Sequence, residues 1–341
     1  MEGSDPMAKG LARFMGAQDM TVGSPVKKLI QFSIPLLIGN LAQQLYNTVD
    51  SIVVGRYVGD NALAAVGASG PMINLLLVLF VGISTGANVM VAQYFGAKRR
   101  SELSDTVGTV ITLTLLASII IMIVGPLLVP PFLRMVDTPV EIFDMTSSYL
   151  TIYFLGIAGM AYYNIIAGVL RGMGDSVMPL LFLMAACLTN IVLDLLFVAK
   201  FGWGVAGVGI ATVTSQVVAA ALILAALRKK GAVYELDLKQ VRFTSRLLRD
   251  IVKIGLPAGI QADMYSISNI LIQASVNSFG TNTIAAWTAQ GKVDSFFWMV
   301  LGAYGVSITT FVGQNFGAQQ YHRVRKSIWV CMGMAALTTI L

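Results

Sequence analysis

The stretch VMPLLFLMAACLTNIVLDLLFVA, from Val177 to Ala199, decides the fold class of this chain. It is long and apolar enough to cross a bilayer as one helix, since about 20 apolar residues suffice. Even so, it carries Asn190 and Asp194 one helical turn apart. A charged carboxylate is costly in hydrocarbon, so such residues usually face a water-filled cavity and handle ions or substrate. A plain hydrogen bond to a neighbouring helix is the simpler alternative for this pair.

A second apolar stretch repeats the pattern. Four polar residues follow one another there at i, i+3, i+7 and i+10: Asn40, Gln43, Asn47 and Asp50. This spacing puts them on one face of one helix, which favours a wet face. Asp50 also lies close to Arg56, so by itself it could be a charge at the membrane interface.

The composition supports a membrane protein throughout. Hydrophobic residues make up 56% of the chain and charged residues only 12%, which is typical of a polytopic membrane protein. The net charge of +6 comes from residues in short loops, where they orient the protein in the membrane, so we expect no nucleic-acid partner. Cys187 and Cys331 lie inside apolar segments, which argues against a disulfide framework or redox chemistry.

The apolar pattern predicts eight spanning helices and the start of a ninth. We place them at residues 28–54, 62–94, 106–133, 147–170, 177–199, 204–227, 250–278 and 284–316, with the ninth beginning near 327. Most Lys and Arg residues fall on one side of these spans, whereas Arg56, Arg134 and Lys200 lie opposite. By the positive-inside rule, the N-terminal segment (1–26) and the loop at 228–249 are cytoplasmic. We expect a multi-pass protein of the inner (cytoplasmic) membrane.

An internal repeat organises the chain. VAQYFGA, which ends at Ala97, recurs as VGQNFGA, which ends at Ala318, and Pro35 and Asn47 match Pro257 and Asn269 at nearly the same offset. The copies have the same orientation, as in a parallel repeat. The sequence thus predicts an all-α polytopic membrane protein with two parallel-repeat six-helix lobes.

The second predicted lobe is incomplete. The N-lobe covers 27–227 and contains six spans, whereas the partial C-lobe covers 250–341. The apolar stretch after Lys326 gives only about 22 Å of helix at 1.5 Å per residue, too short for a core about 30 Å thick. We expect twelve spans in the working protein.

The sequence argues against a nucleotide as the energy source of this protein. Gly291 and Lys292 lack the preceding glycine of a nucleotide-binding loop, so nucleotide-driven pumping is excluded. The lone histidine, His322, falls in a predicted loop, which leaves carboxylates to handle protons within the membrane. Burial and a neighbouring acid favour the protonated form of a carboxyl group. The same oxygens could instead hold Na+, helped by Asn190 and the hydroxyl of Thr212.

Other polar residues could line a cavity or form a second site. We assign cavity or substrate contacts to five residues: Gln43, Asn47, Tyr149, Tyr153 and Asn164. A possible C-lobe polar site comprises Asp263, Lys292 and Asp294, where a structural ion pair is as good an interpretation as a coupling role.

The segment RGMGDSVMP, from Arg171 to Pro179, contains the sequence GMGD and resembles the GxGD signature of intramembrane aspartyl proteases. Here Asp175 falls in a predicted cytoplasmic turn instead of a membrane helix, so we expect a tight turn there and no enzyme.

Over nearly all its length the chain resembles the multidrug and toxic compound extrusion (MATE) family. The resemblance is carried by seven segments: IPLLIGNLAQQLYNTVDSIVVGRYVGDNALAAVG, VAQYFGAKR, RGMGDSVMP, TNIVLDLLFV, GVGIATVTSQ, GLPAGIQ and VGQNFGAQQ. It implies two six-helix lobes around a central cavity. It also implies a multidrug efflux antiporter, linked to antibiotic resistance, that exports cationic or aromatic compounds in exchange for H+ or Na+.

The resemblance also suggests roles for particular residues. Asp50 matches the family's first-helix acid, and Asn190 and Asp194 match the fifth-helix pair of the N-lobe cation site. Thr212 matches the sixth-helix hydroxyl, while Tyr149 and Asn164 fit the fourth-helix polar positions. Many relatives carry Glu where this chain has Tyr265, with Asp263 two residues earlier. This difference argues for an N-lobe mechanism.

The expected partners are the lipid bilayer and small cationic or aromatic molecules, with no resident cofactor and a monomeric protein. The main alternative is a lipid-linked saccharide flippase of the same superfamily. Such a protein needs several basic residues in its cavity for a pyrophosphate, and Lys292 alone is a poor supply. The sequence neither names the substrate nor chooses between H+ and Na+.

Overall fold

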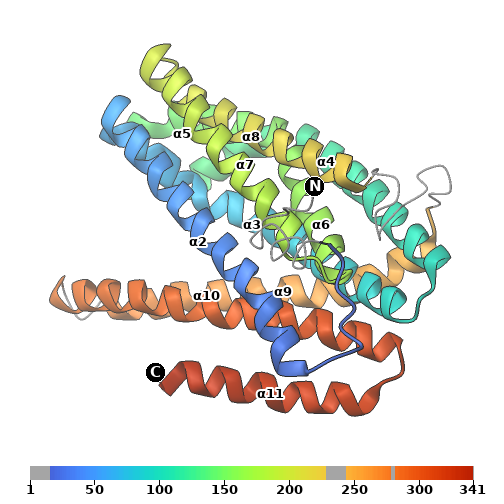
Figure 1. Cartoon of the computed structure of the whole chain (residues 1–341). Coiled ribbons are helices and arrows are strands. Elements are labelled where there is room, and N and C mark those ends of the chain that lie inside the picture. Colours follow the sequence, from blue (N-terminus) through green and yellow to red (C-terminus); the bar gives the residue numbers. More distant parts are fainter. Residues whose placement is uncertain (1–15, 228–242, 278–280, 341) are drawn as a thin grey trace, which may run out of the picture.

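Long helices follow one another along almost the whole of the chain that the computed structural model describes, residues 16–227, 243–277 and 281–340. No strand occurs in these ranges, so the all-α prediction is confirmed. Figure 1 shows the helices: α2 (Pro25–Tyr57), α3 (Asp60–Gly96), α4 (Arg100–Met135), α5 (Val140–Leu155), α6 (Ile157–Gly172), α7 (Val177–Asp194), the π-helix η1 (Leu195–Lys200), α8 (Gly204–Leu227), α9 (Ser245–Asn277), α10 (Thr281–Gly317) and α11 (Tyr321–Ile340).

Several of these helices could cross a bilayer by length and composition alone. Within the described ranges these are α4, α7 with η1, α8 and the Val293–Gly317 part of α10, and the bent pair of α5 and α6 adds a fifth if it is one span. This is the pattern of a multi-pass membrane protein. Helices α2 and α9 carry more charged and amide side chains, and their spans at 28–54 and 250–278 stay predictions. The spans at 62–94 and from 327 also stay predictions.

The predicted single span at 147–170 is wrong in one respect, because the chain breaks there. Helix α5 ends at Leu155 and α6 begins at Ile157, with a bend of 53° between them. A Cβ on the intervening Gly156 would overlap the Val213 side chain of α8. The close approach of α8 therefore needs a glycine at this point, and glycine is a poor helix former.

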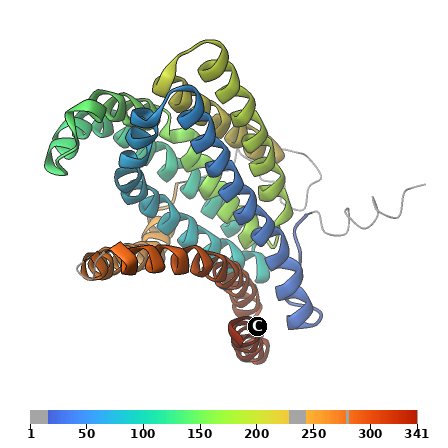
Figure 2. The same ribbon diagram turned by 90° about the vertical axis from the view of Figure 1, so that its left-hand side faces the viewer.

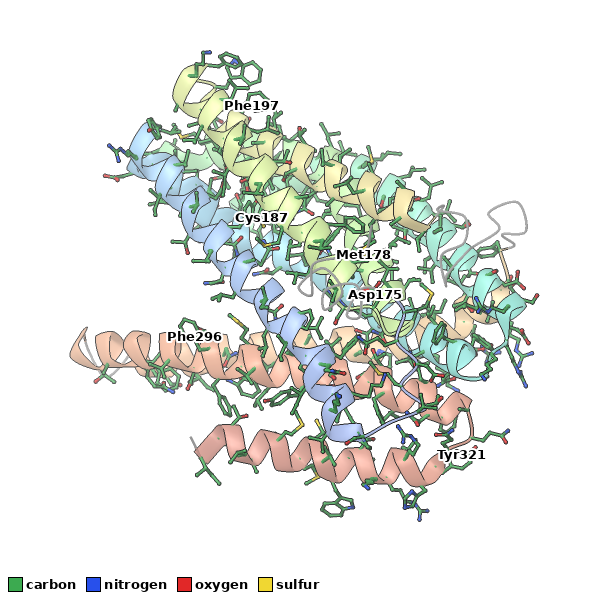
Figure 3. The ribbon with its side chains drawn as sticks, viewed as in Figure 1. Asp175, Met178, Cys187, Phe197, Phe296 and Tyr321 are labelled. Atoms are coloured by element: carbon green, nitrogen blue, oxygen red, sulfur yellow. The ribbon has the colours of Figure 1, made fainter. Side chains whose placement is uncertain are left out.

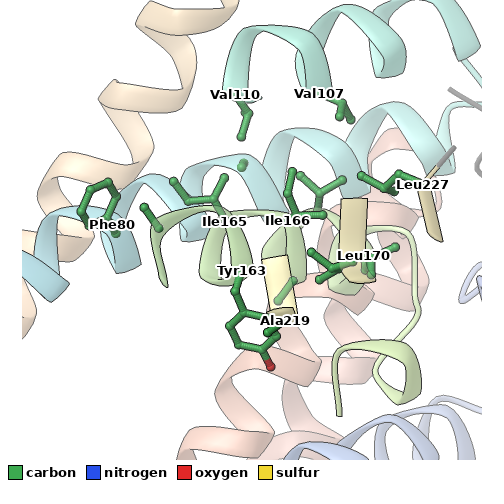
Figure 4. Packing of buried hydrophobic residues seen from close by; sticks show 14 of the residues in the cluster. Phe80, Val107, Val110, Tyr163, Ile165, Ile166, Leu170, Ala219 and Leu227 are labelled. Atoms are coloured by element: carbon green, nitrogen blue, oxygen red, sulfur yellow. The ribbon is translucent and has the colours of Figure 1, made fainter. Parts of the chain in front are cut away.

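Helix α6 is the centre of the first lobe, which we define as α2 to α8. Apart from Asn164 and Arg171 its residues are largely apolar, and most of them are buried, as expected for a helix surrounded by others. In Figure 4, Ile165, Ile166 and Leu170 of α6 lie among Phe80 of α3 and Ala219 of α8. This packing fixes α3 and α8 around α6.

The second lobe, defined as α9 to α11, lies along one side of the first lobe, as Figure 2 shows. Helix α3 packs against both α9 and α10. The two copies of the repeated motif meet where α3 and α10 cross. A Cβ on Gly96 would overlap the Gln314 carbonyl oxygen, and a Cβ on Gly317 would overlap that of Gln93. This reciprocal contact fits the two-lobe repeat.

The segment at residues 16–24, here called the N-terminal strap, ties the two lobes together at the same end. The Met20 amide donates to Gln314 Oε1 (2.8 Å), and the Met20 carbonyl accepts from Asn315 Nδ2 (3.1 Å). Arg323 donates to the carbonyls of Met20 (3.0 Å) and Gly23 (2.8 Å). From this end the lobes diverge towards the end of α2 and the start of α10 (Figure 1).

Candidate functional site

Four polar residues predicted to act together meet inside the first lobe. Asp50 comes from α2, Asn190 and Asp194 from α7, and Thr212 from α8. All four are buried, with exposed fractions of 9%, 0%, 1% and 8% in that order. Helix α2 packs against both α7 and α8, and this packing brings Asp50 to the pair that lies one turn apart on α7.

Hydrogen bonds orient the cluster around Asn190. With its side-chain amide turned to satisfy both neighbours, Asn190 Nδ2 donates to Asp194 Oδ2 (2.7 Å) and Asn190 Oδ1 accepts from the Thr212 amide (3.2 Å). The carboxyl groups of Asp50 and Asp194 interact directly with each other. Two ionised carboxylates in contact would repel each other strongly, so the pair needs a proton or a cation.

Several oxygens of this cluster have no partner. Asp50 Oδ1, Asp194 Oδ1 and Thr212 Oγ1 are buried without a hydrogen bond. No basic side chain in the described ranges forms an ion pair with either acid. A buried group that can still accept a hydrogen bond or a metal ion is costly to leave unsatisfied. The oxygen-only set of two carboxylates and a hydroxyl suits a proton or a hard cation such as Na+.

Tyrosines form the wall beside the acids. Tyr46 and Tyr149 are buried and lie close enough to interact electrostatically with Asp50 and Asp194. The ring of Tyr153 lies 6.3 Å from that of Tyr149, and its hydroxyl donates to Met160 Sδ (2.8 Å). Sequence reasoning missed Tyr46, although its place one turn before Asp50 on the same helix was a usable signal.

The backbone changes character directly after the site. The α-helical hydrogen bonding of α7 ends at Asp194, and the π-helix η1 begins at Leu195. The ring of Phe197 in η1 stacks on Trp203 at 4.9 Å, at the far end of α7 from Asp175 (Figure 3). Such π-turns are rare and frequently occur at functional sites.

Three other predicted cavity residues lie outside this cluster. Gln43 Nε2 donates to Asn47 Oδ1 along α2 (3.4 Å), and Asn47 is exposed. Asn164 Nδ2 donates to the Met160 carbonyl of its own helix (2.9 Å). These contacts are local, so the structure does not bring Gln43, Asn47 or Asn164 to the acids.

The possible C-lobe polar site is only partly described. The side chains of Asp263 and Lys292 lie outside the described residues, so their pairing stays a prediction. Asp294 is partly buried and accepts a hydrogen bond from Gln290 Nε2 (2.6 Å) on its own helix. Among the described residues, no group of three or more His, Cys, Asp or Glu side chains could hold a metal ion.

The GMGD sequence forms a turn, as expected. Gly174 has a φ of +87°, and Asp175 Oδ1 accepts hydrogen bonds from the amides of Val177 and Met178 at 3.0 Å each. Asp175 therefore caps the start of α7, where Figure 3 labels it beside Met178. This capping role explains the acid without a protease function.

A helical membrane protein with two repeated lobes and a pair of buried acids that no described basic side chain contacts has the features of a transporter. The comparison with protein-family models identifies the family. The chain belongs to the MatE family, whose model matches residues 35–196 and 257–341. The two matched parts begin at Pro35 and Pro257, the pair that the repeat aligns.

Curated relatives and solved structures agree with this assignment. The chain is 30% identical over 306 residues to the probable multidrug resistance protein YoeA of Bacillus subtilis (strain 168), covering 88% of this chain and 66% of that protein. It is 30% identical over 316 residues to the probable multidrug resistance protein YpnP of the same strain, covering 91% and 69%. It therefore spans about two thirds of the length of these relatives.

The fold matches known MATE structures closely. A crystal structure of MATE in the straight conformation aligns with a TM-score of 0.87 and 25% identity, covering 94% of this chain and 72% of the other. MATE in the bent conformation aligns with a TM-score of 0.87 and 26% identity over the same shares. The MATE resemblance is thus confirmed, and the family is one of membrane transporters and not of enzymes.

Proposed function

We propose that this chain forms the ion-coupling part of a secondary active multidrug exporter that exchanges cationic or aromatic compounds for H+ or Na+. The observation that carries the proposal is the contact between Asp50 and Asp194, which are buried and have no basic partner in the described part of the chain. Multidrug export itself is suggested by the names of relatives such as YoeA.

Helix α2 links the ion site to the contact between the lobes. Its second half carries Asp50, whereas its first half packs on α10, where the Ser307 hydroxyl donates to the Leu29 carbonyl (3.1 Å). Pro35 lies between the two halves and weakens the helical hydrogen bonding there. Binding of an ion at Asp50 and Asp194 would shift α2 and with it the fit of the second lobe, as alternating access requires.

The proposed orientation follows from charge. Lys98 and Arg99 precede α4 and Arg100 begins it, and Arg323 binds the N-terminal strap at the same end. The positive-inside rule makes this end cytoplasmic. The lobes touch at this cytoplasmic end and diverge at the opposite end. The conformation therefore opens to the outer side of the inner membrane. We propose that one chain acts as a monomer, because both lobes are on the same polypeptide.

Replacing the acid tests the proposal. The Asp194→Asn variant, in the full natural protein reconstituted into proteoliposomes, should lose efflux of a cationic dye by at least about tenfold, because it cannot bind or release the ion. A pH gradient and a Na+ gradient applied separately identify the coupling ion.

Asp137→Asn is the matched control. Asp137 is exposed and has a φ of +50°, which Asn adopts readily, so this change should leave efflux intact. Unimpaired efflux by the correctly folded Asp194→Asn protein would refute the ion site.

A further inference from the structure

Arg171, at the end of α6, borders a small cavity between the two lobes. The cavity has a volume of about 70 Å³. Asn40 of α2 and Ser176, just before α7, form part of its wall on the side of the first lobe. On the other side, Ala303 and Val306 of α10 complete it. The cavity therefore exists only while the two lobes are in contact here.

Within the described residues, the guanidinium of Arg171 has no hydrogen-bond or ion-pair partner. Its Nε is buried without a hydrogen bond, and it forms no hydrogen bond or ion pair within the described part of the chain. Asp175 is near in sequence, but its Oδ1 accepts the amides of Val177 and Met178 instead. A cation that is largely removed from water and left unpaired is costly, so the site favours a negative partner.

The groups around Arg171 suit an anion. A guanidinium offers five N–H donors in a planar fork that matches a carboxylate. The Asn40 amide and the Ser176 hydroxyl can also donate, whereas no Asp or Glu lines the cavity. A site for one water needs only about 10–15 Å³, so this cavity has room for a larger guest. The Tyr163 hydroxyl already donates to the Pro179 carbonyl (3.0 Å) and holds the wall in place.

We propose that this cavity binds a small anion, either chloride or a carboxylate group about the size of acetate, between Arg171, Asn40 and Ser176. Because α10 forms the opposite wall, a bound anion stabilises the conformation in which the lobes touch at this end. The site lies apart from the Asp50 and Asp194 pair and does not depend on the exporter proposal.

A thermal unfolding titration tests the site directly. The full natural protein is purified in detergent with gluconate, which is too large for the cavity, as the only anion. Chloride or acetate then replaces gluconate at constant ionic strength and pH. The melting temperature should rise by a few degrees and saturate, as binding to the folded state alone requires. A rise with acetate alone assigns the site to an organic carboxylate, and a rise with both assigns it to free anions.

Two variants locate the effect. Arg171→Gln should abolish the rise, whereas Arg134→Gln, which removes an exposed arginine at the end of α4, should keep it. Ser176→Ala should move the midpoint of the titration to a severalfold higher concentration. The proposal is overturned if neither anion raises the melting temperature of the native protein, or if Arg171→Gln responds as the native protein does.

A second measurement covers the case in which Arg171→Gln does not fold. Arg171→Lys keeps the positive charge but loses the planar fork of N–H donors. The anion concentration at the midpoint of its titration should therefore rise about tenfold. Crystals of the native protein soaked in bromide should show an anomalous peak beside Arg171. If chloride raises the melting temperature of the native protein, absence of that peak in a lobe-closed crystal would overturn the assignment.

Discussion

At the scale of single residues, Asp50 and Asp194 are notable because they are buried in contact with each other and no basic residue of the described chain neutralises them. An acid pair of this kind is a poor structural device, since Ser or Asn would hold two helices together at lower cost. The unsatisfied Asp50 Oδ1, Asp194 Oδ1 and Thr212 Oγ1 point to a missing proton or cation. This is the physical reason for assigning the pair to ion coupling.

Tyr46 should tune this site. Replacing it with Phe removes a hydroxyl beside Asp50 and Thr212 while keeping the ring packed. We expect the apparent affinity for the coupling ion to fall by about two- to tenfold, because one polar group beside the acids is removed, with maximal efflux unchanged. Efflux measured against the concentration of the ion checks this. Tyr57→Phe, at the exposed end of α2, is the control, and an equal effect in both variants would count against the role of Tyr46.

The sequence predicted which residues share a helix face where that depends only on local spacing. Asn190 and Asp194 are one turn apart on one helix, so their shared face follows from helical geometry. Asn164 looked equally suitable, but its amide donates to the Met160 carbonyl of its own helix. That choice depends on the conformation of one side chain, which no sequence pattern specifies. Tyr46 was overlooked because a tyrosine in an apolar helix usually serves only to pack against its neighbours.

At the scale of helices, the crossing of α3 and α10 depends on glycine. Gly96→Ala would place a methyl group against the Gln314 carbonyl, and a backbone atom cannot move aside cheaply. We expect a loss of about 1–3 kcal/mol in the free energy of unfolding, measured by thermal or denaturant unfolding in detergent. Gly70→Ala, on the same helix with open space around it, should be neutral or slightly stabilising. Equal stability of the two variants would contradict the close crossing.

The N-terminal strap should be held by one arginine. Arg323 donates to the Met20 and Gly23 carbonyls and also to Asn315 Oδ1 (2.8 Å). Arg323→Gln should therefore raise the hydrogen exchange rate of the Met20 amide by about tenfold or more, since exchange reports local opening. Arg325→Gln removes an exposed arginine two residues on and should leave that rate unchanged. Slow exchange in both proteins would show that other contacts hold the strap.

The helices themselves were predictable, but their interruptions were not. Apolar stretches of sufficient length predict helices from local sequence alone. The break at Gly156 arises from the approach of Val213, and the π-helix after Asp194 has no local marker. The break at Gly156 arises where α5 packs against α8, and the π-helix arises where α7 packs against α8.

At the scale of the whole molecule, α2 should transmit ion binding to the lobes. Asp194→Asn mimics the neutralised site, so we expect it to bring the diverging ends of the lobes together. Spin labels at Tyr57 and Val293, both exposed, can report this as a shorter distance in pulsed electron resonance, with Cys187 and Cys331 replaced by Ser. The Asp137→Asn protein should keep the longer distance. An unchanged distance in Asp194→Asn would separate ion binding from lobe movement.

By itself, the sequence determined the all-helical membrane class, the repeat and the two polar faces that carry Asp50 and Asp194, because periodicity and composition are local properties of the chain. Only the tertiary structure decided which faces meet. The contact between Asp50 and Asp194, the crossing at Gly96 and Gly317, and the cavity beside Arg171 all join residues far apart in the sequence. Their partners are chosen by how whole helices pack, and this choice depends on every side chain along each interface.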